Sequence, residues 1–417
     1  MRNGHVPPAD QAGLRRANLA LVVRTLREHG QQSRAQLSAL SGLSKATVSN
    51  LVSELESRRL VRAAGLTAGR QGRPGQLVEL SPGSVCGIGL EINLEYLRAT
   101  VLDLAGTVVT EQLVPLRVVE LGPQRCLDQL AELARSMLAT VAAVGAWPAG
   151  ITVAVPGLVD TQAGVVRFAP NLRWRQIALV DGLAARVDLP LERCAVDNDA
   201  NLAALAEHTS GAASGTDDLL CIVGSSGVGA GLLAAGVPVR GASGFAGEVG
   251  HLSLDPLGPS CPCGNRGCWE RQIDLGTLLE VMSSPDDPVR DPSLAVSDRL
   301  RIIRVRAEAG DRRTLDALQQ VGDALGVGLA LLINVLNPAA VVLGGYFAEL
   351  YEWLVEHARI QIASRVLSPE AARAAILPST LGFTAAIRGG AQHAMRMVMD
   401  NPTLAPVVAS EPTEAPA

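Results

Sequence analysis

An acid–amide–acid cluster of Asp197, Asn198 and Asp199 lies at the end of an apolar run and at the start of an alanine-rich helix expected from the sequence. A carboxylate in that position could take a proton from a substrate hydroxyl and so act as a general base. It could equally accept a hydrogen bond from a ligand that is bound without reacting. The residue types alone leave both interpretations of Asp199 open.

A cysteine cluster later in the chain has the spacing of a metal site. Cys261, Cys263 and Cys268 form a C-x-C-x4-C motif, and His251 lies ten residues before the first cysteine. Three thiolates and one imidazole satisfy tetrahedral zinc and leave no open position, which is typical of a structural site. The other four cysteines are scattered in apolar surroundings, a pattern unlike a disulfide framework. We therefore predict a structural Zn²⁺ held by these four side chains.

A third set of polar residues belongs to a helix that begins at Ser44. Its apolar positions recur at helical spacing and would point inward; they are Val48, Leu51, Val52 and Leu55. Small polar side chains remain on the outer face, where they can meet base edges or phosphates of DNA. The DNA contacts predicted from this helix are Ser44, Lys45, Thr47, Ser49 and Asn50.

Two shorter helical patterns precede this helix, in helix-turn-helix order. Residues 16–29 carry one apolar stripe, and Ser33 with Gln36 forms a capping box for a short second helix. Residues 1–80 hold 12 Lys and Arg against 5 Asp and Glu, a net charge of +7, whereas the remainder carries −12. A basic module on an acidic body favours a polyanion as the partner of the module alone.

The segment after the third helix predicts a wing. Strand-like pieces at Leu60–Arg62 and Gln76–Leu80 flank a tip rich in glycine and arginine. Arg70 and Arg73 on this tip could reach a phosphate or a minor groove. The alternative is a protein-binding helical bundle with a solvated arginine turn, but several independent signals favour DNA.

The rest of the chain predicts a two-lobed α/β fold. Short strands and turns begin at Val85, a similar pattern recurs at 218–240, and helices follow each group. The repetition indicates an internal duplication with a cleft between the lobes. Clefts of that kind hold small ligands.

Composition and length bound the organisation of the chain. With 417 residues, 48% of them hydrophobic, it can bury more than one core. The ranges we expect are a flexible tail at 1–14, a winged helix-turn-helix DNA-binding domain at 15–82, a two-lobed domain at 84–400 and a disordered tail at 401–417. The N-terminus lacks an apolar stretch of signal length, so we expect a cytoplasmic protein with no membrane partner.

The motifs of the chain resemble those of the ROK (repressor, open reading frame, kinase) family in its transcriptional-regulator type. The resemblance spans residues 15–400 and includes VPGLVD (155–160), APNLRW (169–174), DNDAN (197–201), GSSGVGAG (224–231), GFAGEVGHL (244–252), CPCGNRGCWE (261–270) and VVLGG (341–345). It implies an actin-like sugar-kinase fold with a zinc loop beside a sugar pocket. Family members are kinases or, when fused to a DNA-binding module, sugar-responsive regulators.

The resemblance also implies the residues of the sugar pocket. Asn198 and Asp199 would hold sugar hydroxyls, with Asp199 the base in kinase members. His251 would bind the sugar with one ring nitrogen and zinc with the other, because ligation of one nitrogen fixes the tautomer of the other. The implied sugar contacts are Asn171, Asn198, Asp199, Glu248, His251 and Glu270.

One stretch departs from the pattern of the kinases. Their D-x-G-G-T turn, which lets backbone N–H groups and a hydroxyl approach ATP phosphates, corresponds here to Glu91-Ile92-Asn93-Leu94-Glu95. A carboxylate about 4 Å from a phosphate charge would cost on the order of 4 kcal/mol at an intermediate dielectric. We therefore expect no catalysis and a vestigial role for Asp199, which would only accept a hydrogen bond from the sugar.

The leading hypothesis is thus a repressor of carbohydrate metabolism genes that responds to a sugar or sugar derivative. We expect it to bind an inverted-repeat operator in double-stranded DNA as a homodimer or homotetramer. An ATP-dependent sugar kinase that also binds DNA is the alternative. A zinc-responsive regulator ranks last, since closed structural zinc sites bind too tightly for sensing.

Overall fold

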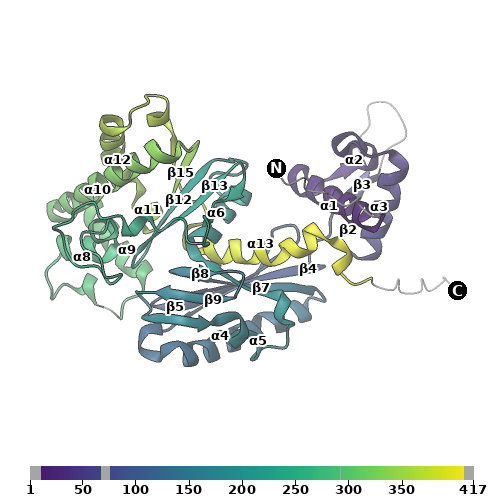
Figure 1. Cartoon of the computed structure of the whole chain (residues 1–417), viewed down its shortest axis with the longest axis horizontal. Coiled ribbons are helices and arrows are strands. Elements are labelled where there is room, and N and C mark those ends of the chain that lie inside the picture. The colour runs from purple at the N-terminus through teal and green to yellow at the C-terminus, as the bar shows by residue number, and fades with distance from the viewer. Residues whose placement is uncertain (1–10, 67–75, 292, 408–417) are drawn as a thin grey trace, which may run out of the picture.

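The computed structural model describes residues 11–66, 76–291 and 293–407. Figure 1 shows a small N-terminal module beside a larger body of two lobes. The elements of the module are α1 (Gln11–His29), β1 (Gln32–Ser33), α2 (Arg34–Ser41), α3 (Lys45–Ser57), β2 (Val61–Leu66) and β3 (Gln76–Leu80). Its strands form one antiparallel sheet in the order β1-β3-β2. The predicted winged helix-turn-helix is confirmed.

Local sequence signals account for the helices of this module. Ser33 and Gln36 form both halves of the capping box at the start of α2. The Ser44 hydroxyl caps α3 by accepting a hydrogen bond from the Thr47 backbone N–H at 3.1 Å. The inward stripe of α3 is buried as predicted. Caps and stripes depend on residues within one or two turns, so they are readable from sequence.

The ends of the chain differ from the expectation. Helix α1 begins at Gln11, so residues 11–14 are helical and are not part of a flexible tail. At the other end, the structure describes residues 401–407, which lie in the range expected to be a tail. Arg58 of the module donates to the carbonyl oxygens of Thr403 at 3.0 Å and Ala405 at 2.6 Å. Arg70 and Arg73 lie outside the described residues.

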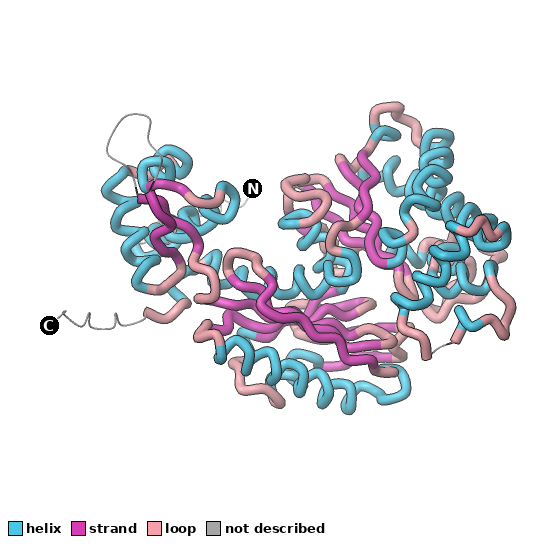
Figure 2. The backbone as a smooth tube through the Cα atoms, turned by 180° about the vertical axis from the view of Figure 1, so that it is seen from behind, coloured by secondary structure: helices cyan, strands magenta, loops and turns pink. Residues whose placement is uncertain are grey.

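The first lobe of the body is built on a mixed five-stranded sheet in the order β11-β7-β4-β5-β6. Its elements are β4 (Val85–Ile92), β5 (Tyr96–Asp103), β6 (Val108–Pro115), α4 (Val118–Ala143), β7 (Trp147–Val155), α5 (Leu179–Ala184) and β11 (Cys194–Asn198). Figure 2 shows helices on both sides of this sheet. A small sheet of β8 (Leu158–Asp160), β9 (Val165–Ala169) and β10 (Trp174–Ala178) was not predicted.

The second lobe repeats this sheet in the order β14-β13-β12-β15-β16. Its strands are β12 (Leu219–Gly224), β13 (Val228–Ala234), β14 (Val237–Pro238), β15 (Ala340–Gly345) and β16 (Ala375–Pro378). In both lobes the first three strands are antiparallel and the last two are parallel to the first, which confirms the predicted duplication. The longer helices are α6 (Asp199–Ser210), α8 (Leu275–Met282), α9 (Val296–Glu308), α10 (Arg312–Leu336), α12 (Tyr351–Arg365) and α13 (Ala385–Asp400).

Helix α10 is long and apolar enough to cross a membrane by length and composition alone. More than half of the apolar window is buried within the second lobe, where α10 packs against α12. The core helix of a soluble protein passes the same test, so this is weak evidence for a membrane span.

Helix α13 joins the parts of the molecule. It packs on β4 of the first lobe and on α6, and its C-terminal half continues to the DNA-binding module (Figure 1). A side chain at Gly89 would overlap the Ile387 carbonyl oxygen of α13, so glycine is required for this close approach. Met395 and Met399 of α13 share one apolar core with Leu19 and Val22 of α1. The module is thus packed against α13 and against first-lobe residues such as Val85 and Leu102, which belong to the same core.

Candidate functional site

A cleft between the two lobes collects side chains from both halves of the chain. All six residues that the resemblance implies as sugar contacts line this one hollow. Asn171, Asn198 and Asp199 come from the first lobe and the start of α6, whereas Glu248, His251 and Glu270 come from the segment before α8. The structure therefore brings together residues that are up to about a hundred positions apart in sequence.

Asn198 and Asp199 lie where β11 ends and α6 begins. The Asn198 carboxamide oxygen accepts from the backbone N–H groups of Ala200 at 2.9 Å and Asn201 at 3.2 Å. Its amide donates to the Gly157 carbonyl oxygen at 3.1 Å. Asn198 therefore caps the N-terminus of α6, and one N–H of its side-chain amide remains available to a ligand.

The Asp199 side chain lines the cleft and is only partly exposed. Burial raises its pKa to about 6, and the hydrogen bond from the Ala200 backbone N–H opposes that rise. A carboxylate with such a pKa is an able proton acceptor near neutral pH. The pKa of Asp199 therefore does not separate a general base from a hydrogen-bond acceptor, and the discrimination must come from the phosphate-binding side of the cleft.

A second buried carboxylate, Glu91, lies behind the cleft, at the position where the resemblance implies the aspartate of the kinases. Glu91 is 6% exposed, and its Oε1 accepts a hydrogen bond from the Tyr96 hydroxyl at 3.2 Å. Its Oε2 has no hydrogen-bond partner among the described residues. Burial raises the pKa of Glu91 to about 7; the charge of Arg98 lowers it and that of Asp199 raises it further.

The turn that follows Glu91 is tied to the second lobe. Glu95, at the position of the kinase threonine, accepts a hydrogen bond from Arg299 of α9 at 3.0 Å. The Asn93 side-chain oxygen accepts from the Glu95 backbone N–H at 3.3 Å, which fixes the turn locally. A negative side chain with its own cationic partner therefore occupies the stretch where a phosphate loop would be expected.

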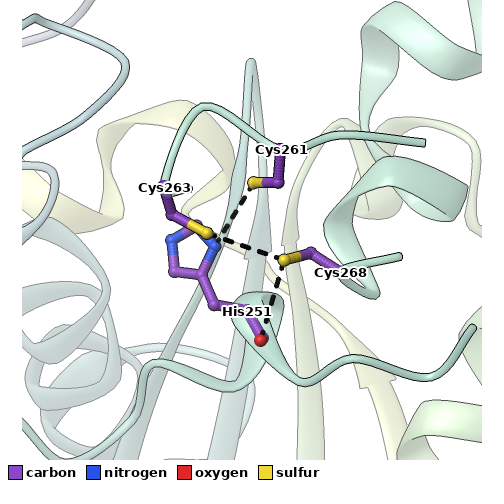
Figure 3. Close-up of side chains that lie close together, drawn as sticks. All are labelled: His251, Cys261, Cys263 and Cys268. Atoms are coloured by element: carbon purple, nitrogen blue, oxygen red, sulfur yellow. Dashed lines mark hydrogen bonds between the residues drawn. The ribbon is translucent and has the colours of Figure 1, made fainter. Parts of the chain in front are cut away.

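The four predicted metal ligands form a compact group, shown in Figure 3. Their ligand atoms all lie within 4.8 Å of one another. The Cys263 and Cys268 sulfurs are 3.7 Å apart, and the Cys261 sulfur is 3.7 Å from Nδ1 of His251. Bonds of about 2.3 Å to a tetrahedral metal place sulfurs roughly 3.8 Å apart, so the donor set fits zinc. The two sulfurs are too far apart for a disulfide.

His251 connects the metal ligands to the cleft. Its Nδ1 faces Cys261, whereas its Nε2 lies 3.9 Å from a carboxylate oxygen of Glu248. Glu270 reaches the same group, with Oε1 3.4 Å from Nδ1 of His251 and 2.9 Å from the Cys261 sulfur. Burial raises the pKa of Glu248 to about 7, and the charges of Asp199 and Glu270 raise it further. The orientation of the His251 ring agrees with a nitrogen on the metal and a nitrogen toward a ligand.

The predicted DNA contacts lie on the outer face of the module. Ser44, Lys45 and Asn50 are exposed, and Thr47 and Ser49 are partly exposed. The hydroxyl groups of Ser44 and Thr47 also form a hydrogen bond with each other, with 2.8 Å between the oxygens. Only part of their hydrogen-bonding capacity is therefore left for DNA.

Sequence reasoning missed several residues that line the cleft. Three of them, Ser225, Ser226 and Gly227, belong to the glycine-rich stretch at 224–231. A side chain at Gly227 would come within 2.8 Å of the Asn171 amide nitrogen, so this glycine makes room for the pocket residues. Asn201 and Phe245 also line the cleft. The strand–turn pattern around the glycines was the signal that could have found the serines.

Comparison with known proteins accounts for this combination of cleft, metal cluster and module. A model of the ROK family matches residues 87–396, and a model of the IclR helix-turn-helix domain matches residues 9–65. The chain belongs to the ROK family. Because a helix-turn-helix domain precedes the ROK domain, the chain is of the regulator type.

Relatives and solved structures agree with this placement. The chain is 31% identical to the xylose repressor of Bacillus subtilis (strain 168) over 91% of this chain and 95% of the relative. It is 28% identical to the DNA-binding transcriptional dual regulator NagC of Escherichia coli (strain K12), over 81% of this chain and 82% of the relative. A ROK family transcriptional regulator, described as a homologue of the Escherichia coli MLC protein, has the same fold, with a TM-score of 0.73 over 93% of this chain and 97% of that chain at 24% identity.

A kinase of the family is also similar in structure. The ROK glucokinase from Streptomyces griseus, solved with glucose and AMPPNP, covers 75% of this chain and 99% of its own at 27% identity, with a TM-score of 0.63. The part of this chain that it leaves uncovered is large enough to contain the DNA-binding module. The xylose repressors of Bacillus subtilis (strain 168) and Bacillus spizizenii each match 91% of this chain.

Proposed function

We propose that this ROK protein is a sugar-responsive transcriptional repressor of carbohydrate metabolism genes. Residues 15–82 would bind operator DNA, and residues 84–400 would bind a sugar or sugar derivative in the cleft. The observation that carries the proposal is the gathering of six hydrogen-bonding side chains in a cleft on the same chain as an exposed reading helix. A xylose repressor and an N-acetylglucosamine repressor among the relatives support sugar as the ligand class.

Helix α13 offers a route from the cleft to the DNA-binding module. The start of α6 carries Asn198 and Asp199, and α6 packs directly on α13. A side chain at Gly389 of α13 would overlap the Leu202 carbonyl oxygen of α6, so the two helices are in direct backbone contact at this glycine. A ligand that closes the cleft would move α6, and α13 would carry that movement to α1. Coupling free energies between such sites are typically about 1–3 kcal/mol.

In this proposal the chain has no kinase activity. Two observations favour that conclusion: the buried Glu91 carboxylate, and Glu95 engaged with Arg299 at the position of the kinase threonine. Glu91 places a buried acid where ATP phosphates would have to bind, and the Glu95–Arg299 ion pair fills the turn that would have to hold them. A coupled assay of ADP release with common hexoses tests this point; turnover at rates of roughly 1–100 s⁻¹ would establish the sugar-kinase alternative.

The metal in this proposal is zinc with a structural role. His251, Cys261, Cys263 and Cys268 would hold it with no open position, so zinc supplies cross-linking of the loop and no Lewis-acid chemistry. By fixing Nδ1 of His251 it also orients Nε2 toward the cleft. We also propose that the protein is cytoplasmic and acts as a homodimer or homotetramer.

Operator titrations with and without sugar test the proposed function. A labelled DNA fragment that the protein binds is titrated by fluorescence anisotropy in the presence of free and derivatised sugars. A responsive sugar should change the affinity for DNA by about 5–150-fold. Asp199→Ala and Glu248→Ala should abolish that change and leave sugar-free DNA binding within a few fold, whereas Glu111→Ala on the exposed face of β6 should respond like the wild type. A full response in both cleft variants would exclude the cleft as the ligand site.

A further inference from the structure

The charge of the cleft narrows the chemical class of its ligand beyond the sugar or sugar derivative of the proposed function. Asp199, Glu248 and Glu270 line the hollow, and no described lining residue is a lysine or an arginine. Glu91 lies behind this surface, close enough for its charge to interact with that of Asp199. A ligand that enters the cleft therefore meets three or four carboxylates and no cation on the wall.

A helix N-terminus is the usual neutral site for a phosphate, but the one in this cleft is already occupied. The first backbone N–H groups of α6 point to oxygens of the chain itself. The Ala200 N–H bonds the Asn198 and Asp199 side-chain oxygens, both at 2.9 Å, and the Asn201 N–H bonds Asn198 at 3.2 Å. The Asp199 carboxylate thus takes the position that an anionic ligand would need.

The arginines around the cleft are engaged with partners. Arg240 makes two hydrogen bonds to the Asp197 carboxylate, at 2.9 and 2.6 Å. Arg167 pairs with Asp160 at 2.6 Å in an adjoining hollow that shares Gly244 and Phe245 with the cleft. Each pair is close to neutral as a unit, so neither offers a free positive charge to a phosphate.

Two further arginines lie on the side of the Glu91–Glu95 turn. Arg299 bonds Glu95, and Arg98 donates to the Phe383 carbonyl oxygen at 2.7 Å while its guanidinium lies over the Tyr96 ring. Zinc in the neighbouring site would not reverse the balance, because three thiolates give a Cys₃His centre a net charge of −1. The negative field of the cleft is therefore a property of the loaded protein as well.

We propose that the cleft selects an uncharged sugar and rejects the phosphate ester of the same sugar. The inference rests on the proposed function, since it concerns the ligand of the same cleft. Carboxylates accept hydrogen bonds from sugar hydroxyls, and Ser225, Ser226 and Asn171 add neutral donors. A phosphate dianion in the cleft would lose its hydrating water without a cationic side chain to replace it. The carboxylates of Asp199 and Glu248 would also repel it.

Calorimetric titration of the full-length, zinc-loaded protein with matched pairs of ligands tests the inference. The pairs are D-xylose and its 5-phosphate, D-glucose and its 6-phosphate, and N-acetylglucosamine and its 6-phosphate. At pH 8 the esters are dianions, and the medium lies above the value of about 7 to which burial raises the pKa of Glu91. We expect at least one free sugar to bind and its ester to bind at least about a hundredfold more weakly.

The outcomes separate this inference from the proposed function. An ester that binds as tightly as its free sugar, or more tightly, overturns the inference and leaves a sugar-responsive repressor intact. A panel in which no sugar binds in either form, and none changes operator affinity, overturns the proposed function and the inference with it.

Charge-neutralising variants test whether the negative charge of the cleft causes the weaker binding of the phosphate ester. Glu91→Gln and Glu248→Gln should each lower the ratio of ester to free-sugar dissociation constants by about fivefold or more. Glu111→Gln, an exposed acid on β6, is the matched control and should keep the wild-type ratio. The ratio is taken within each variant, so a general loss of affinity does not affect it. A ratio unchanged in both cleft variants would mean that shape, and not charge, excludes the ester.

Discussion

At the scale of single residues, Cys263 is the metal ligand whose replacement disturbs the surroundings least. It is partly exposed, whereas Cys261 and Cys268 are buried. Cys263→Ser removes one thiolate from the tetrahedral set, so we expect purified protein with well under one zinc per chain and a lower melting temperature. Elemental analysis measures the zinc. The control is Cys194→Ala, which changes a cysteine far from the cluster in sequence and should keep the metal. Full zinc occupancy in Cys263→Ser would refute the proposed ligand set.

Glu91 gives a prediction about pH. Its pKa in the folded protein is raised from 4.5 to about 7, so the folded state holds this proton more tightly than the unfolded state. The stabilisation is complete below about pH 4.5 and is lost as the pH rises through about 7. Glu91→Gln can keep the hydrogen bond from Tyr96 and has no charge to bury. It should therefore raise the free energy of unfolding at pH 8, by up to about 3 kcal/mol, with little change at pH 5.

Unfolding curves at pH 5, 6, 7 and 8 measure this effect. Glu111→Gln serves as the control, because the same chemical change on an exposed strand should leave the pH dependence as it is in the wild type. If the curves of Glu91→Gln and the wild type run parallel from pH 5 to pH 8, then Glu91 is not held at a raised pKa in the folded protein.

At the scale of elements, α3 is the part of the module that would enter the major groove. Asn50 is exposed in the middle of this helix, and its amide can make two hydrogen bonds to an adenine edge. Asn50→Ala should lower the affinity for operator DNA by about 1–3 kcal/mol, roughly 5–150-fold, and leave sugar binding unchanged.

The control for this element is Ser57→Ala at the C-terminal end of the same helix. Ser57 is exposed, and among the described residues its hydroxyl bonds only the Glu54 carbonyl oxygen, so its loss should change DNA affinity by less than about twofold. Anisotropy titrations with each variant supply the comparison. Equal operator affinities for Asn50→Ala and Ser57→Ala would mean that α3 does not read the DNA through Asn50.

At the scale of the whole molecule, we propose one DNA-reading helix, α3, among the described residues, and the body carries a net negative charge that DNA would repel. Specific binding then needs a second copy of the module, and two-fold symmetry is the usual solution. We expect footprints of two inverted half-sites whose centres are separated by one or more helical turns, about 34–36 Å each. Protection of a single half-site by a monomer, measured by footprinting together with light scattering, would contradict this arrangement.

The sequence by itself determined the features that depend on neighbouring residues. The capping box at Ser33, the buried stripe of α3, the repeated strand–turn pattern and the spacing of the cysteines were all readable, because each involves contacts over one or two turns or a single loop. The ROK motifs added the six cleft residues, which the structure brings to one place. Their contacts with sugar remain a prediction.

Only the tertiary structure decided the features that depend on distant parts of the chain. Glu95 and Arg299 are 204 positions apart, and Arg58 holds Ala405 from 347 positions away. No local pattern records such pairs, since they exist only after two lobes and a module have packed around α13. The charge of the cleft also depends on the fold. The sequence shows the acids, but only the fold pairs the surrounding arginines with other acids and with a backbone carbonyl.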